Sequence, residues 1–365
     1  MAYTTIDKPT DYFNTVLYTG NGTAIGSGGL AVTGVGFQPD WVWLKNRTTG
    51  DRSHQLYDVV RGVTKGLKTN STDEENTNSE RLTAFGSDGF TVGNNQDVNT
   101  SGNAHVSWNW KAGTSFSNDA SATGVGTIDS TGSINTTAGF SIISYTGTGS
   151  AGTVAHGLAS TPQAIIIKNR TDSSSSFWGV YHHSSFVNAS DPNVLYLNST
   201  GAASDDTNVF GTSTTFNSTV FSVGDYNGSN GSSDNIIAYC FAEKQGYSKF
   251  GSYTGNGNAN GTFIYTGFKP AWVVIKRSSA SGNNWVMYDN KRDVHNVVHH
   301  RLHVDLSNAE VDTSSSTVNN IDFLSNGIKI RNSGGAWNNS GDTFIYMCFA
   351  ESPFVNSNGV PNNAG

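Results

Sequence analysis

The sequence carries little charge and has no basic block. Only 13% of its 365 residues are Asp, Glu, Lys or Arg, and the formal net charge is −7. This balance argues against a nucleic acid partner, which would require clustered Lys and Arg. No apolar run approaches the roughly 18 residues of a membrane-spanning helix, and the first residues lack the apolar core of a signal peptide. We therefore expect no nucleic acid partner, no membrane insertion and synthesis in a cytoplasm.

Cysteine is also scarce, since only Cys240 and Cys348 occur. They occupy equivalent positions of the internal repeat described below, so we do not expect them to meet within one chain. Free cysteine is among the most buried residue types. Two buried, reduced thiols would suit folding in a reducing cytoplasm.

Residues that form turns and strands are abundant instead. The chain has 42 Gly, many Ser, Thr and Asn, and 11% aromatic residues. Gly and Asn adopt positive φ in turns, whereas Thr, Tyr and Trp suit pleated surfaces. Disordered chains combine low hydrophobicity with high net charge, and this sequence does not. The composition therefore predicts an ordered, all-β fold.

A short apolar run that follows a proline occurs three times in the chain. The three copies cover residues 36–47, 158–170 and 267–277. Proline cannot donate to a sheet ladder, so it suits the start of a strand. The Val-, Ile- and Trp-rich run behind it is too short for a helix and reads as a strand buried on both faces. Each copy also follows a Tyr-Thr-Gly-x-Gly motif, at residues 18–22, 145–149 and 253–257.

This repeat is longer than the roughly 20–50 residues of a solenoid unit, so we expect one small domain per copy. We predict three tandem antiparallel β-sandwich repeats, over residues 14–113, 140–246 and 247–354. Residues 1–13 would form an N-terminal arm and residues 355–365 a C-terminal tail. Residues 114–139 contain almost no large apolar residue. They would form a Ser/Thr/Gly linker or an extended arm laid across a neighbour.

Metal-binding patterns are weak. His299 and His303 would share a strand face but lie about 13 Å apart, which is too far for one ion. The adjacent His182 and His183 would point to opposite faces. Residues 97–102 copy the first half of a calcium loop, but Trp108 stands where that loop needs a bidentate Glu. We therefore expect no metal and no cofactor, although a structural calcium ion at that turn stays open.

The sequence shows no catalytic constellation either. It has no Gly-x-Ser-x-Gly, His-Glu-x-x-His or P-loop motif, and no Asp/Glu pair recurs among the repeats. Asp58 with Arg61, and Asp289 with Arg292, would form ion pairs across turns; a surface pair contributes about 0–1 kcal/mol. We therefore expect a protein that is not an enzyme.

Tryptophan is frequent for so polar a chain, with eight residues. Most lie at equivalent strand positions of the repeats, which predicts core packing. Trp337 differs because it lies in a loop of Asn, Gly and Asp, where it could stack on a sugar or contact a protein. Trp178, on the aromatic strand of the second repeat, and Asn338 complete the predicted ligand-binding residues.

Three segments resemble virion structural proteins of marine bacteriophages. They are the closing residues 344–361, the Gly-Phe-x-Pro-x-Trp-Val strands, and residues 140–149. The resemblance implies lectin-like β-sandwich repeats of the concanavalin or jelly-roll type on a virion surface, made in the host cytoplasm. It also implies other virion proteins as partners. Oligomers of such chains would cover exposed sheet edges, so we expect a homo-oligomer, with a trimer among the states open.

From this resemblance we expect a fibre or knob subunit that contacts the host through a surface glycan or protein. Two alternatives stay open: a capsid decoration (cement) protein and a glycan-processing enzyme. A host-binding fibre would need an exposed, aromatic-lined groove, a decoration protein would need broad contacts to a capsid lattice, and an enzyme would need two convergent carboxylates in a cleft.

Overall fold

A computed structural model describes residues 3–172, 176–185, 193–211, 216–315 and 320–362. Every pair of named strands in it is antiparallel, so the predicted all-β class is confirmed, and the arrangement is consistent with β-sandwiches. Helices are limited to single turns of three or four residues. Among the described residues, no helix is long and apolar enough to cross a membrane.

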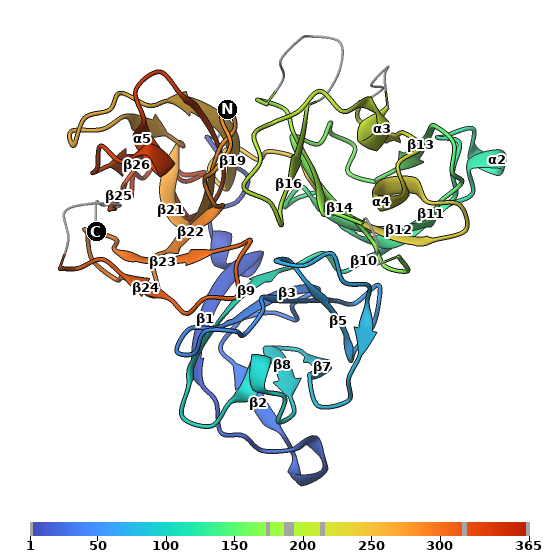
Figure 1. Cartoon of the computed structure of the whole chain (residues 1–365), viewed down its shortest axis with the longest axis horizontal. Helices are drawn as coiled ribbons and strands as arrows, with labels where there is room; N and C mark the ends of the chain where they lie inside the picture. Colours follow the sequence, from blue (N-terminus) through green and yellow to red (C-terminus); the bar gives the residue numbers. More distant parts are fainter. Residues whose placement is uncertain (1–2, 173–175, 186–192, 212–215, 316–319, 363–365) are drawn as a thin grey trace.

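The chain forms three lobes around a common centre (Figure 1), each with a large and a small sheet. In the first lobe the large sheet has the order β1 (Phe13–Thr19), β9 (Ala104–Trp110), β3 (Trp41–Asn46), β4 (Gln55–Asp58), β5 (Lys65–Lys68) and β6 (Asn76–Thr77). Its small sheet has the order β2 (Leu30–Thr33), β8 (Gly89–Val92) and β7 (Leu82–Gly86). Its short helices are η1 (Pro9–Asp11), η2 (Ile25–Ser27) and α1 (Gln96–Asn99).

The second lobe repeats this plan with two additional strands at one edge. Its large sheet has the order β10 (Thr114–Asn118), β11 (Ser130–Asn135), β12 (Phe140–Thr146), β18 (Asn235–Phe241), β14 (Ala164–Asn169), β15 (Gly179–His182) and β16 (Val194–Tyr196). Opposite it lie β13 (Gly152–Ala155) and β17 (Val220–Val223). Its helices are α2 (Ala120–Thr123), α3 (Thr207–Phe210) and α4 (Asn227–Asn230).

The third lobe matches the first strand for strand. Its large sheet has the order β19 (Ser248–Thr254), β27 (Thr343–Pro353), β21 (Phe268–Arg277), β22 (Val286–Asp289), β23 (His300–His303) and β24 (Val311–Asp312). Its small sheet has the order β20 (Phe263–Tyr265), β26 (Gly327–Ile330) and β25 (Ile321–Leu324), and its helix is α5 (Gly335–Asn338).

Residues 114–139 are not a linker, and that prediction is wrong. Strand β10 pairs with β11, and β11 pairs with β12 along its whole length, so the segment extends the large sheet of the second lobe. Its side chains are small because one face of these two edge strands is exposed to solvent. Backbone pairing, which the side-chain composition does not reveal, holds the segment in place.

The three large sheets share one central core. One face of each sheet contributes apolar side chains to a single cluster that includes Trp41, Tyr239, Phe241, Trp272 and Phe349. The opposite face packs on the small sheet of the same lobe, in a separate core for each lobe. Each large sheet is therefore covered on both sides, which explains why β3, β14 and β21 carry apolar runs without alternation.

Both ends of the described chain lie against the third lobe. The Tyr3 hydroxyl donates to the Gly267 carbonyl at 2.8 Å, and the side chain of Ile6 is buried in the central core. In the tail, the Ser357 amide donates to Asp7 at 2.7 Å. The predicted arm and tail are thus packed on the same lobe and on each other.

Residues 82–92 form a hairpin of β7 and β8, with Ser87 and Asp88 at the turn. Gly89 is required there because a Cβ would lie 1.9 Å from the Val32 carbonyl oxygen of the neighbouring strand. Gly327 occupies the equivalent position in the third lobe, where a Cβ would lie 2.2 Å from the Ile264 carbonyl oxygen. Glycine follows Asp88 in the first lobe and Asn326 in the third because the backbone of the neighbouring strand passes close to it.

Candidate functional site

The lobes meet at three junctions. The first junction lies between the second and first lobes, the second junction between the first and third lobes, and the third junction between the third and second lobes. The lysine that follows the apolar run of each lobe is buried and reaches across one of them. The ammonium–carbonyl contacts are Lys168 to Thr72 (3.2 Å), Lys45 to Ser307 (3.3 Å) and Lys276 to Thr200 (3.2 Å). Burial lowers the pKa of each lysine to about 8. The recurrent lysine thus joins neighbouring lobes.

Trp178 belongs to a second set of equivalent donors at the same junctions. The donors and their carbonyl acceptors are Trp178 to Lys68 (2.8 Å), His54 to His303 (3.0 Å) and Trp285 to Tyr196 (3.0 Å). The side chain of Trp178 is fully buried. The prediction that Trp178 lines an exposed aromatic groove is therefore wrong, because its ring fills the space between two lobes.

The predicted ion pair of Asp58 and Arg61 is present, but it lies in the interior rather than at the surface. The two side chains are fully buried, and Arg61 Nε donates to Asp58 Oδ2 at 2.5 Å. The same Asp58 oxygen accepts a 2.8 Å bond from the Tyr239 hydroxyl of the second lobe. Asp289 and Arg292 repeat the buried pair in the third lobe. Removal of one partner would strand a buried charge, so these pairs matter far more than surface pairs.

A glutamate extends the first of these pairs into the neighbouring lobe. Glu75 accepts 3.0 and 2.9 Å bonds from both arms of Arg170, which belongs to the second lobe, and a 3.1 Å bond from Arg61. Burial favours the neutral carboxyl, but the hydrogen bond from Arg170 and the charge of Arg61 outweigh it and lower the pKa of Glu75. The first junction therefore contains a continuous chain of charged groups.

Trp337 and Asn338 lie on α5, beneath the small sheet of the third lobe. Trp337 is only 5% exposed and Asn338 is fully buried. The guanidinium carbon of Arg301 lies 5.0 Å from the centre of the Trp337 ring, so a cation already covers part of this ring. The Asn338 amide donates to the Asn258 and Asn332 carbonyls, both at 2.8 Å. Neither side chain is available to an external ligand.

Asn338 is one copy of a turn clamp that occurs in all three lobes. Each clamp joins a buried Asn at the end of a short helix to the Tyr-Thr-Gly-x-Gly turn. The equivalent asparagines are Asn99, Asn230 and Asn338, and each accepts a main-chain N–H from the turn. The Tyr of each turn donates to the carbonyl preceding that Asn, at 2.7, 2.5 and 2.6 Å for Tyr18, Tyr145 and Tyr253. The prediction of ligand binding at Trp337 and Asn338 is therefore wrong.

The calcium-like stretch of residues 97–102 is also occupied by internal contacts. Its first three residues form the end of α1. The Asp97 carboxylate accepts from Gln55 at 3.0 Å and lies 3.4 Å from Arg81 Nη2. The Asn99 amide belongs to the turn clamp. These groups already have partners, which favours the interpretation of this stretch as a shared turn.

The two cysteines agree with the prediction. Cys240 and Cys348 are free, fully buried and at equivalent positions of β18 and β27. Burial raises the pKa of both thiols, which keeps them protonated and unreactive.

A groove of about 320 Å³ lies on the second lobe, where β10 and β11 extend the sheet. Small hydroxyl and amide side chains and two carboxylates line it. The carboxylates also hold the local backbone, since Asp119 accepts from the Ala122 amide and Asp129 from the Ala120 amide. Hydrogen bonds from Ser121 and Ala122 lower the pKa of Asp119. The groove is therefore polar and anionic.

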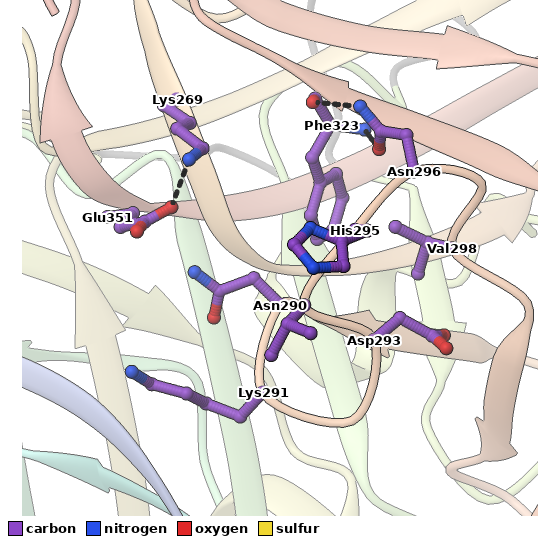
Figure 2. A pocket seen from close by; sticks show the side chains of 10 residues that line it. Lys269, Asn290, Lys291, Asp293, His295, Asn296, Val298, Phe323 and Glu351 are labelled. Carbon is purple, nitrogen blue, oxygen red and sulfur yellow. Dashed lines mark hydrogen bonds and ion pairs between the residues drawn. The ribbon is translucent and has the colours of Figure 1, made fainter. Parts of the chain in front are cut away.

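The third lobe has a smaller pocket of about 170 Å³ beside the loop between β22 and β23 (Figure 2). An ion pair between Lys269 and Glu351, 3.1 Å long, forms one side of it. On the other side the Asn296 amide donates to the Phe323 carbonyl at 2.8 Å. The Asp293 carboxylate points away from Lys269 and Glu351 (Figure 2).

The fold and junctions define a three-lobed β protein whose repeats share one core. Residues 8–353 match the family described as a domain of unknown function, DUF7483, and the chain belongs to this family. No curated protein matches the chain. A similar solved structure is that of the major capsid protein P2 from bacteriophage PM2, with 11% identity and a TM-score of 0.20. That match covers 56% of this chain and 93% of the capsid protein.

Proposed function

We propose that this protein is a non-enzymatic structural subunit of a bacteriophage virion surface, used as a fibre or knob subunit that contacts the host. The observation that carries the proposal is the shared central core together with the three buried junctions. A surface subunit of a particle must keep its shape outside the cell without disulfides. Lobes that share a core and buried hydrogen bonds meet this requirement.

The carboxylates near the described cavities support a role without catalysis. In the groove of the second lobe, Asp119 and Asp129 are held by main-chain N–H groups. In the pocket of the third lobe, Glu351 is paired with Lys269. Glycoside hydrolysis uses a pair of carboxyl groups, one as proton donor and the other as nucleophile or base. The contacts at these two cavities are those of structural groups.

The groove of the second lobe is the surface that best suits a host glycan. Hydroxyl, amide and carboxylate groups that line it can exchange hydrogen bonds with sugar hydroxyls. It replaces the aromatic groove expected from the sequence, since Trp178 and Trp337 are buried.

The substitution Thr131→Arg would fill the groove without removing a capping carboxylate, and Thr33→Arg on the first lobe is a matched control. We expect only the former to reduce adsorption to the host.

Capsid decoration is the second candidate, and one observation favours it. The three lobes occupy equivalent positions around one axis, so a single chain has the outline of a trimer (Figure 1). Such a unit could cover a threefold position of a capsid lattice without forming an oligomer. A fibre subunit would instead assemble with further copies of the chain.

Cryo-electron microscopy of the intact particle tests both candidates. Density for the three-lobed unit at a tail tip or on fibres is expected from the fibre proposal. Density spread over the capsid lattice would overturn it in favour of decoration. Absence of the chain from purified particles, measured by mass spectrometry, would contradict any virion role.

A further inference from the structure

The loop between β22 and β23 brings two histidines and an aspartate to one point at the edge of the third lobe. Asp293, His299 and His300 each offer a ligand atom, and the three atoms lie within 4.8 Å of one another. Asp293 Oδ1 is 3.3 Å from His299 Nε2 and 2.6 Å from His300 Nδ1. No turn, cap or lobe junction described above accounts for this convergence of three ligand types.

The carboxylate of Asp293 is held in a fixed orientation. Its Oδ2 atom accepts the main-chain N–H groups of His299 and His300, at 2.8 and 2.7 Å. These bonds direct Oδ1 toward both imidazole rings. The side chain is only 5% exposed, whereas the side chains of His299 and His300 are 27% and 23% exposed. The cluster is therefore rigid on its inner side and open to solvent on its outer side.

A second carboxylate faces the remaining nitrogen of each ring. Asp312 lies on β24, directly across from His300. Its Oδ1 is 3.1 Å from His299 Nδ1, and its Oδ2 is 3.9 Å from His300 Nε2. Metal-ligating histidines usually donate their other ring N–H to such a carboxylate, which fixes the tautomer and the ring orientation. Asp312 is therefore placed as the outer partner of the His299 ring, and its other oxygen lies near the His300 ring.

We propose that Asp293 Oδ1, His299 Nε2 and His300 Nδ1 bind a divalent transition metal of the zinc class, with Asp312 as the outer carboxylate. Two imidazoles and one carboxylate suit zinc rather than calcium or magnesium, which prefer oxygen ligands. Ligands 2.0–2.1 Å from a tetrahedral zinc ion lie about 3.3 Å apart. The His299–Asp293 distance of 3.3 Å already has this value, and the metal replaces the shorter His300–Asp293 hydrogen bond.

The metal would secure the end of the second junction. Asp293 follows Arg292, and Asp312 lies two residues after Glu310. Arg292 and Glu310 are joined at 2.9 Å, and Glu310 accepts both arms of Arg47 from the first lobe. An ion that ties the loop to the β23–β24 hairpin therefore also holds Glu310 in place. The role of the site is structural, because it stabilises the lobe contact.

The argument that placed the adjacent His182 and His183 on opposite faces of a strand does not apply to His299 and His300. That argument assumes that both residues lie in one strand, where neighbours point to opposite faces. Strand β23 begins at His300, so His299 lies in irregular backbone before it. The two rings can then approach, with centroids 4.4 Å apart. Asp293 directly follows Arg292, where the first lobe has Gly62 after Arg61, and the longer loop that follows it leads back to His299.

Titration of the purified, chelator-treated full chain with Zn²⁺ and with Co²⁺ tests the site. We expect one equivalent of Zn²⁺ to bind by calorimetry, and Co²⁺ to give visible d–d absorption. His299→Ala and His300→Ala should each weaken Zn²⁺ binding by more than about 100-fold, and Asp312→Asn by about 10–100-fold. Zn²⁺ should also raise the melting temperature of the wild-type chain.

His295→Ala is the matched control, since this exposed histidine lies on the same loop outside the cluster. It should bind Zn²⁺ as the wild type does. Two results would overturn the proposal: no saturable one-to-one binding in the wild type, or binding that His299→Ala and His300→Ala leave unchanged. Circular dichroism of each variant separates loss of the site from loss of the fold.

Discussion

The first and second junctions contain an Arg–Glu pair that the described part of the third junction lacks. Arg170 binds Glu75 through both arms at the first junction, and Arg47 binds Glu310 in the same way at the second. At the third junction the equivalent residues are Ser278 and Ala203. The main-chain hydrogen bond that accompanies the pair is kept in all three, at 3.0, 2.9 and 2.8 Å. A cavity of about 220 Å³ lies beside Ser278 and Ala203.

This comparison separates what sets the arrangement of the lobes from what strengthens it. The shared core, the buried lysine and the main-chain bond occur at every junction, so they suffice to place the lobes. The Arg–Glu pair occurs at two junctions only, among the described residues; the second and third lobes are instead linked by the ion pair of Lys249 with Glu243, close to the point where the chain passes between them. The junctions also differ at the end of the aromatic strand, where Asp58 and Asp289 correspond to His182 of the second lobe. His182 Nε2 lies 3.1 Å from the Tyr346 carbonyl of the third lobe.

The largest expected effect comes from Asp58→Ala. The change leaves the guanidinium of Arg61 buried without its main partner and removes the acceptor of the Tyr239 hydroxyl. Loss of one member of a buried ion pair costs about 3–5 kcal/mol. We expect the free energy of unfolding to fall by this amount, measured by urea unfolding with tryptophan fluorescence.

His182→Ala is the matched variant at the third junction. It removes a neutral hydrogen bond, for which the expected cost is about 1–3 kcal/mol. Equal losses for Asp58→Ala and His182→Ala would contradict the distinction between a charged and a neutral group at this position of the repeat. Asp289→Ala should behave as Asp58→Ala does.

The third junction should also be sensitive to mild acid through His182. Burial lowers the pKa of His182 to about 3, whereas an unfolded histidine titrates near about 6.5. Between these values the unfolded chain binds the additional proton, so the stability contribution is complete above about pH 6.5 and is lost as the pH falls toward 3. At pH 5 the loss is on the order of 2 kcal/mol.

His182→Gln should remove this part of the pH dependence. Urea unfolding at pH 7.5 and at pH 5.0 should show a smaller difference for the variant than for the wild type. His295→Gln, a change of an exposed histidine, controls for the loss of one histidine. If His182→Gln and the wild type lost the same stability between the two pH values, the assignment to His182 would be wrong.

The sequence allowed prediction of the repeat, the strand class and the buried thiols, because each depends on local pattern. It did not show which face of each sheet turns toward another lobe. Trp178 therefore looked like a residue free to bind a ligand, although its ring fills a junction. Trp337 was misread because a single turn of helix, α5, looks like a polar loop in sequence. Residues 114–139 pair through their backbone, which leaves little trace in composition.

The buried indole donors should contribute equally at two unlike junctions. Trp178→Phe and Trp285→Phe each leave a buried carbonyl, of Lys68 or Tyr196, without its N–H partner. We expect each change to lower the free energy of unfolding by about 1–2 kcal/mol. A markedly smaller loss for Trp285→Phe would show that the third junction is weaker in its shared contacts as well as in its charges.

The smallest effect is a gain, obtained by building the missing ion pair at the third junction. Ala203→Glu together with Ser278→Arg would reproduce the positions of Glu310 with Arg47 beside the existing 2.8 Å main-chain bond. A partly exposed pair contributes up to about 1 kcal/mol, and less at high salt. A double-mutant cycle from urea unfolding isolates this coupling, because each single change alone places a charge without a partner beside the cavity.

A coupling energy of zero at low salt would mean that side-chain geometry at this junction prevents the pair. The Arg–Glu pairs of the other two junctions would then depend on a further buried arginine, because Arg61 also binds Glu75 and Arg292 also binds Glu310. Among its described residues the second lobe has no such arginine pair, since His182 stands where the other lobes have the aspartate that holds it.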